Sequence, residues 1–196
     1  MLSRLAGGAG NRVLKLITPF GGGKSHTLAS LYHAARSRKA LDTIPEGKPL
    51  PKPVKVNVAV FDGQQFSAVN GKDFPKAKGK ANTMWGWIAW SLGGKEAYDI
   101  IRKDDEMRVA PGGDDILKIL GDSANLILLD EVLEYLISAS GIKVIDTTLR
   151  DETLSFIKRL TVAVGNTKKS ALVFSLQSSN RESLQYINLL QTVDHL

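Results

Sequence analysis

The 196-residue sequence, 43% hydrophobic and 23% charged, has the composition of a folded globular protein, and its length predicts a single domain over residues 1–196. It contains no cysteine and no apolar run of the roughly 18 residues that cross a bilayer, which excludes disulfides, thiolate metal sites and membrane helices and favours a cytoplasmic protein. Residues 1–80 hold 14 Lys and Arg against 4 Asp and Glu, a net charge of +10, and the remaining residues hold 12 against 16, a net charge of −4, which together give +6. A basic first half suits phosphate or nucleic-acid partners, although a solvated, lysine-rich surface is the more common explanation.

The first half of the chain predicts two strands, one helix and two polar loops. Residues 12–18 (RVLKLIT) predict a strand, and residues 25–39 predict a helix with apolar side chains at helical spacing. Residues 46–53 (EGKPLPKP) predict an exposed loop without regular structure. Residues 54–61 (VKVNVAVF) predict a strand near a sheet edge, and residues 71–80 (GKDFPKAKGK) a second, basic loop.

The second half alternates helices and strands. Helices are predicted at residues 83–92, 96–103 and 154–164, and two more are predicted after the breaker at 110–115 and from Asn180 onward. Strands are predicted at residues 125–131 and 170–176. Such alternation predicts an α/β fold with a mainly parallel sheet flanked by helices.

A glycine-rich stretch, TPFGGGKSH, separates the first predicted strand from the first predicted helix, which is the context of a phosphate-binding loop. Thr18 stands where the common G-x-x-x-x-G-K-[ST] pattern has its first glycine. Glycines permit positive φ angles, and a helix N-terminus attracts anions. Lys24 is positioned to reach the β- and γ-phosphates, and the Ser25 hydroxyl to bind Mg²⁺. The candidate nucleotide-binding residues are Gly21, Gly22, Gly23, Lys24, Ser25 and His26, of which His26 is expected to pack beside the loop.

A second motif, LILLDE, places Asp130 and Glu131 directly after four apolar residues. Both acids therefore belong at the carboxyl end of a buried strand, where open α/β sheets bind ligands. A phosphate-transferring site needs one acid for Mg²⁺ and a second to orient or deprotonate the attacking water, and we predict these roles for Asp130 and Glu131. An ordinary solvated helix start explains two acids, but it does not explain both motifs in this order.

The stretch TPFGGGKSHTLASLYHA resembles a family of large bacterial and archaeal AAA-type ATPases, often encoded near DNA methyltransferases and helicases in phage-defence clusters. The likeness continues through TMWGWIAWSLGGKEAYDIIRKDDEMRVAPGGDDI and LILLDEVLEYL, and in that family threonine also stands at the position of Thr18. The resemblance implies a three-layer α/β/α P-loop NTPase, ATP as the nucleotide and the roles given above for Lys24, Ser25, Asp130 and Glu131. It also implies a γ-phosphate sensor at Gln177 or Ser178.

Members of that family are much longer, with a fifth core strand, a helical lid and an arginine finger after the sensor strand. The resemblance therefore implies an incomplete AAA-type core without the lid, as in an N-terminal fragment. The strand at 12–18 would then form a sheet edge, from which we expect self-association. Arg181, Arg150 and Arg159 are candidate arginine fingers, each weighed against a plain surface role.

Two functions remain open from the sequence. The first is a Mg²⁺-dependent ATPase that remodels DNA or protein, with phage defence as the setting that the resemblance implies. The alternative is a nucleotide-dependent switch that binds ATP and hydrolyses it little or not at all.

Three tryptophans, Trp85, Trp87 and Trp90, are candidates for a base-stacking role. A core position is the expectation for Trp85, and the position of Trp87 stays open.

Overall fold

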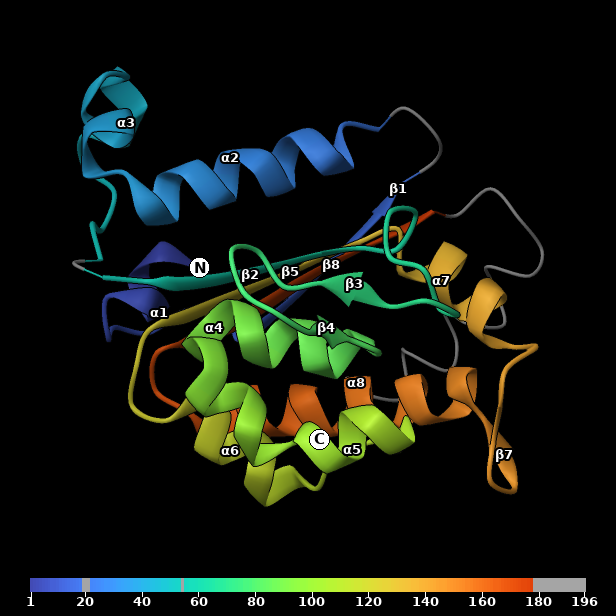
Figure 1. Cartoon of the computed structure of the whole chain (residues 1–196). Helices are drawn as coiled ribbons and strands as arrows, with labels where there is room; N and C mark the ends of the chain where they lie inside the picture. Colours follow the sequence, from blue (N-terminus) through green and yellow to red (C-terminus); the bar gives the residue numbers. More distant parts are fainter. Residues whose placement is uncertain (19–21, 54, 178–196) are drawn as a thin grey trace.

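The computed structural model describes residues 1–18, 22–53 and 55–177, and a parallel β-sheet runs through its centre (Figure 1). Four strands pair in the order β1-β8-β5-β2, and every pairing is parallel. Their bounds are Val13–Thr18 for β1, Asn57–Asp62 for β2, Asn125–Asp130 for β5 and Ser170–Gln177 for β8. The predicted α/β fold with a parallel sheet is therefore confirmed, and β2 lies at a sheet edge as expected.

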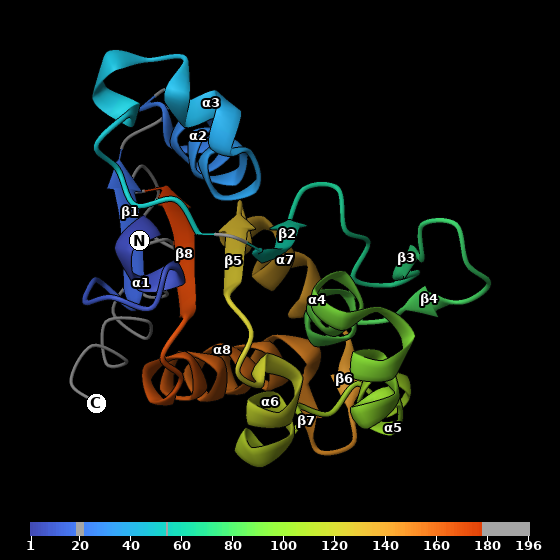
Figure 2. The same cartoon turned by 90° about the vertical axis from the view of Figure 1, so that its left-hand side faces the viewer.

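Alternating side chains of the central strands build two separate cores, which explains their almost continuous apolar sequences. Leu126 and Leu128 of β5 face the first core, and Ile127 and Leu129 face the second. Helices cover both faces of the sheet, so the molecule has three layers (Figures 1 and 2).

The first face carries α1 (Leu2–Leu5) and α2 (Lys24–Arg36), which contribute Leu5, Leu28 and Ala35 to its core. Arg4 is buried and fastens α1 to the sheet: Nε donates to the Ser170 carbonyl at 2.6 Å and Nη2 to the Val164 carbonyl at 3.0 Å. A short helix, α3 (Arg38–Asp42), and a 3₁₀ turn, η1 (Pro45–Gly47), follow α2.

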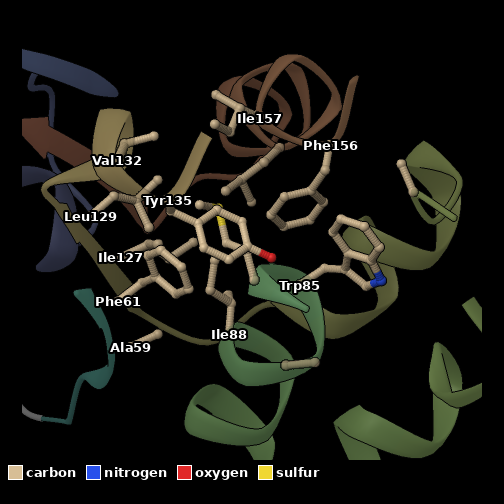
Figure 3. Packing of buried hydrophobic residues seen from close by; sticks show 14 of the residues in the cluster. Ala59, Phe61, Trp85, Ile88, Ile127, Leu129, Val132, Tyr135, Phe156 and Ile157 are labelled. Atoms are coloured by element: carbon tan, nitrogen blue, oxygen red, sulfur yellow. The ribbon is translucent and has the colours of Figure 1, made fainter. Parts of the chain in front are cut away.

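The second face carries the larger core, made by α4 (Met84–Ile100), α6 (Gly113–Leu120), α7 (Val132–Ala139) and α8 (Leu149–Asn166). Figure 3 shows its aromatic centre, where the rings of Phe61 and Tyr135 meet edge to face at 5.1 Å and those of Trp85 and Phe156 lie 5.6 Å apart. Trp85 is 1% exposed, which confirms its predicted core position. Trp87 is half-buried, and its indole N–H donates to the Val60 carbonyl at 2.7 Å.

Several predicted boundaries are wrong, for local reasons. The helix predicted at 25–39 ends at Arg36, because Ser37 is extended, and α3 begins anew. The helices predicted at 83–92 and 96–103 are replaced by α4, which bends at Gly94 (φ 63°), and by α5 (Arg102–Met107). The helix predicted at 154–164 extends over the whole of α8.

Two predicted loops contain short regular structure. The basic stretch 71–80 holds β3 (Lys72–Asp73), which pairs antiparallel with β4 (Lys80–Ala81), and η1 overlaps the loop predicted at 46–53. The sequence also gave no prediction for α7 or for the small hairpin of β6 (Lys143–Val144) and β7 (Thr147–Thr148). Within the described ranges, no helix is both long and apolar enough to cross a membrane. The helix expected from Asn180 lies outside the described residues.

Candidate functional site

The carboxyl ends of the four parallel strands form one edge of the sheet, and both sequence motifs lie there. Thr18 of β1 is in register with Gln177 of β8, and Asp62 of β2 with Asp130 of β5. The tip of β1, the start of α2 and the start of α7 all lie on the right of Figure 1. The parallel sheet therefore brings the glycine-rich stretch and the two acids to the same edge.

The described part of the glycine-rich stretch, Gly22 and Gly23, leads directly into α2. Gly23 is the N-cap, with φ 72° and ψ 16°, a left-handed conformation that glycine adopts without strain. A Cβ built on Gly23 meets no atom of the described residues within 4 Å. The Thr27 N–H and hydroxyl donate to the Gly23 carbonyl at 2.9 and 3.0 Å, which closes the first helical turn. Gly21 lies outside the described residues.

The side chains that follow Gly23 differ in burial. Lys24 is only 8% exposed although it begins a helix at the surface of the sheet. Gly22, Ser25 and His26 are exposed. The Ser25 hydroxyl is therefore accessible to a ligand, and His26 lies on the exposed side of the first turn of α2. The buried lysine at the positive end of a helix is unusual for a cation and common in sites that bind phosphate.

Asp130 is held by hydrogen bonds to a single oxygen. Its Oδ1 accepts from the Ser175 hydroxyl of β8 and from the Glu131 N–H at 3.1 Å. Among the described residues no donor reaches Oδ2 of this half-buried carboxylate. Ser175 is 1% exposed and was not predicted as a site residue, because its role depends on the pairing of β8 with β5.

Glu131 has a strained backbone, with φ 47° and ψ 42°, at the N-cap of α7. Left-handed conformations of residues other than glycine cluster at functional sites. Partial burial, and then the charge of Asp130, raise the pKa of the Glu131 carboxyl, while the positive charge of Lys24 opposes the rise. The pKa of Glu131 therefore reflects charges from both motifs.

Two further residues support Glu131, and neither was predicted. Gly63 follows β2, and its N–H donates to the Asp130 carbonyl at 2.9 Å. A Cβ at Gly63 would lie 2.0 Å from the Glu131 carbonyl oxygen, so only glycine fits. Asp62 orders the same turn, because its Oδ1 accepts from the Gln64 N–H at 2.9 Å.

The residues present fit a Mg²⁺–nucleotide complex better than a metal ion alone. The described residues contain no group of three or more His, Cys, Asp or Glu side chains that could hold a metal by themselves. Mg²⁺ is commonly bound by one or two protein groups together with phosphate oxygens and water. Ser25 and Asp130 would be those two groups.

The remaining candidates from the sequence lie elsewhere or outside the described residues. Arg159 donates from Nη1 to the carbonyls of Ala110 and Pro111 at 2.7 and 2.9 Å, which secures the loop before α6. Arg150 forms an ion pair with Asp151 at the start of α8. Ser178 and Arg181 fall outside the described residues, and for Gln177 only the backbone position is described.

Comparison with protein families matches residues 1–191 to a family described as the DUF499 N-terminal domain, which is a family of unknown function. The match spans nearly the whole sequence, including both motifs and all strands of the sheet. No curated protein and no solved structure gives a significant match. The chain therefore belongs to the DUF499 N-terminal domain family.

Proposed function

We propose that the chain binds ATP with Mg²⁺ at the carboxyl edge of its sheet and hydrolyses it. One observation carries the proposal: the buried lysine at the N-terminus of α2 and the two acids at the end of the buried strand β5 lie at the same edge of the sheet. ATP in preference to GTP rests on the resemblance of the loop to AAA-type ATPases.

In this proposal each side chain has one task. The N–H groups at the start of α2 and the Lys24 ammonium bind the phosphates and stabilise the negative charge that develops on them. Ser25 and Asp130 would hold Mg²⁺, which would supply positive charge beside the phosphate oxygens. Glu131 accepts a proton from the attacking water as that water forms a bond to the γ-phosphorus. The bond from the γ-phosphorus to the oxygen that bridges it to the β-phosphate then breaks, and ADP and phosphate leave.

Ligand-induced stabilisation tests the proposed binding. A ligand at 100 times its Kd stabilises a protein by about 2.7 kcal/mol. For a chain of this size that corresponds to a rise of about 5–10 °C in the melting temperature. Lys24→Ala should abolish the rise seen with Mg²⁺–ATP. Lys168→Ala, which changes an exposed lysine just before β8, should retain it.

The result that would contradict the proposal is a melting temperature of the parent chain that does not change at millimolar Mg²⁺–ATP. An equal rise in the parent and in Lys24→Ala would place binding elsewhere. Coupling of hydrolysis to remodelling of a macromolecule, and a role in phage defence, follow from the resemblance alone. Phosphate release measured with and without DNA tests whether DNA is that macromolecule.

A further inference from the structure

A second cluster of aromatic and basic side chains lies away from the carboxyl edge, where the β3–β4 hairpin projects beyond α4 (Figure 2). The Phe74 ring stacks on Trp90 of α4, with centroids 3.9 Å apart and planes inclined by 11°. Tyr98, also on α4, meets Phe74 edge to face at 4.9 Å. The proposed nucleotide site uses none of these residues.

These rings line a pocket of about 400 Å³ whose rim is basic. The pocket has the size of an ordinary small-ligand site. Phe74 and Tyr98 are buried, whereas Trp90 is half-buried, so part of the indole faces the pocket. Lysines from the hairpin and from α4 stand around it: Lys78, Lys80 and Lys95.

The charge of the hairpin is not balanced by nearby acids. Residues 71–80 contain four lysines and one aspartate. Within the described part of the chain none of these lysines forms an ion pair: Lys80 donates to the Asn70 carbonyl at 3.0 Å, and the Lys72 ammonium lies over the Trp87 ring at 4.8 Å. Glu106 is the acid at the pocket, since Asp99 is paired with Lys95 and Arg102.

A buried carboxylate holds the pocket in shape. Asp105 is fully buried and accepts from the Tyr98 hydroxyl at 2.9 Å, from the Asn82 N–H at 3.0 Å and from the Thr83 hydroxyl. These bonds join the end of the hairpin to both ends of α4. The aromatic floor is therefore fixed before a ligand arrives, which lowers the entropic cost of binding.

We propose that this pocket binds single-stranded nucleic acid. Sequence-tolerant binding of single strands combines aromatic rings on which bases stack with lysines that follow the phosphates. Here Trp90 supplies the exposed aromatic surface, and Lys78 and Lys80 supply the phosphate contacts on one side of it. Binding at this pocket requires neither ATP nor Mg²⁺, so the inference stands independently of the proposed ATPase site.

Fluorescence anisotropy with labelled oligonucleotides of about 15 nucleotides tests the proposal, with DNA, RNA and duplex DNA in separate titrations without nucleotide or Mg²⁺. The parent chain should bind the single strands more tightly than the duplex, and the two single-strand titrations show which sugar is preferred. Each lost phosphate contact lowers the slope of log affinity against log salt by about 0.7, so Lys78→Glu should weaken binding about tenfold at about 50 mM salt. Lys143→Glu makes the same charge change on the exposed β6–β7 hairpin and should have little effect.

The stacking contact is tested by Trp90→Leu, which should weaken binding without changing the salt slope, while Trp90→Phe should retain more affinity. The melting temperature of each variant shows whether it is folded. If Trp90→Leu does not fold, Trp90→Phe still tests the stacking contact. Failure of the parent to bind at about 50 mM salt would overturn the proposal. Equal weakening by Lys78→Glu and Lys143→Glu would overturn it as well, because it would reduce binding to net charge. Nucleotide and Mg²⁺ are absent from every titration, so the result does not depend on the proposed ATP site.

Discussion

At the scale of single residues, Glu131 shows how local strain prepares a site. Its left-handed backbone turns the Glu131 N–H toward Asp130 Oδ1 and Ser175 Oγ, at 3.1 and 3.3 Å, and the residue is the N-cap of α7. Such a backbone costs about 1–3 kcal/mol and persists only where the surroundings enforce it. The surroundings here are Gly63, which leaves room for the Glu131 carbonyl, and the hydrogen-bonded Asp130. The two acids are therefore held in fixed and different environments, and we expect their substitutions to have different effects.

Glu131→Gln should separate binding from chemistry. Glutamine preserves the shape of the side chain but cannot accept the proton from water, so ATP-dependent stabilisation should persist while phosphate release falls about 100-fold or more. Asp130→Asn should instead weaken binding in a Mg²⁺-dependent manner, because in the proposed site it removes the charge that would face the metal. Thermal shifts and phosphate release, each at several Mg²⁺ concentrations, measure the two effects.

The same pair of variants distinguishes an ATPase from a switch. If the parent chain binds ATP but releases phosphate no faster than Glu131→Gln does, the chain is a nucleotide-dependent switch. If the two substitutions have the same effects on binding and turnover, our division of roles between Asp130 and Glu131 is wrong.

At the scale of elements, long apolar strands were predictable from the sequence and short or polar ones were not. β5 and β8 are buried on both faces, so continuous apolar runs in the sequence predict both strands. β3 and β4 are two-residue strands that each contain an exposed or half-exposed lysine, and nothing in their composition distinguishes them from a loop. α7 was missed because it directly follows β5 and continues its apolar character without a breaker.

The site residues likewise divide into those that a local sequence pattern predicts and those that it does not. Lys24, Ser25, Asp130 and Glu131 stand beside a strand or helix end in the sequence, so their placement at one edge follows from parallel pairing. Ser175 and Gly63 lie on other strands or turns and contact the acids only through strand register. Register between distant strands is set by tertiary packing and cannot be read from a local pattern.

The junction between β2 and α7 is the element-scale feature most sensitive to substitution. Gly63→Ala would place a Cβ 2.0 Å from the Glu131 carbonyl oxygen, a backbone atom that must then move. We expect a loss of about 1–3 kcal/mol in the free energy of unfolding, together with a fall in ATP turnover. Urea unfolding and phosphate release measure the two effects.

Gly113→Ala is the matched control for Gly63→Ala. Gly113 begins α6, and a Cβ there meets no atom within 4 Å, so its stability and turnover should match or exceed those of the parent. Equal behaviour of the two alanine variants would show that Gly63 does not constrain Glu131.

At the scale of the whole molecule, the two edges of the sheet differ. At the β2 edge, the Trp87 indole N–H donates to the outward-facing Val60 carbonyl at 2.7 Å, and α4 packs against the strand. At the other edge, the Leu172 N–H of β8 donates to the Arg12 carbonyl at 2.9 Å. The backbone N–H and C=O groups of Arg12, Leu14 and Leu16 therefore face β8, and those of the alternate residues face outward. Within the described residues no strand pairs with that outer side of β1.

We therefore expect two copies of the chain to associate through β1, because an unpaired apolar strand edge is a template for another strand. The backbone N–H and C=O of Ile17 face outward there and its side chain is 40% exposed, so Ile17→Lys places a charge beside the unpaired edge and should reduce association. Val162→Lys is the matched control, since Val162 on α8 is 41% exposed and lies away from any strand edge. Light scattering across a concentration series should show a parent chain that associates, a Val162→Lys variant that associates equally and an Ile17→Lys variant that remains monomeric. A monomeric parent would contradict the prediction, and equal association by all three proteins would place the contact on another surface.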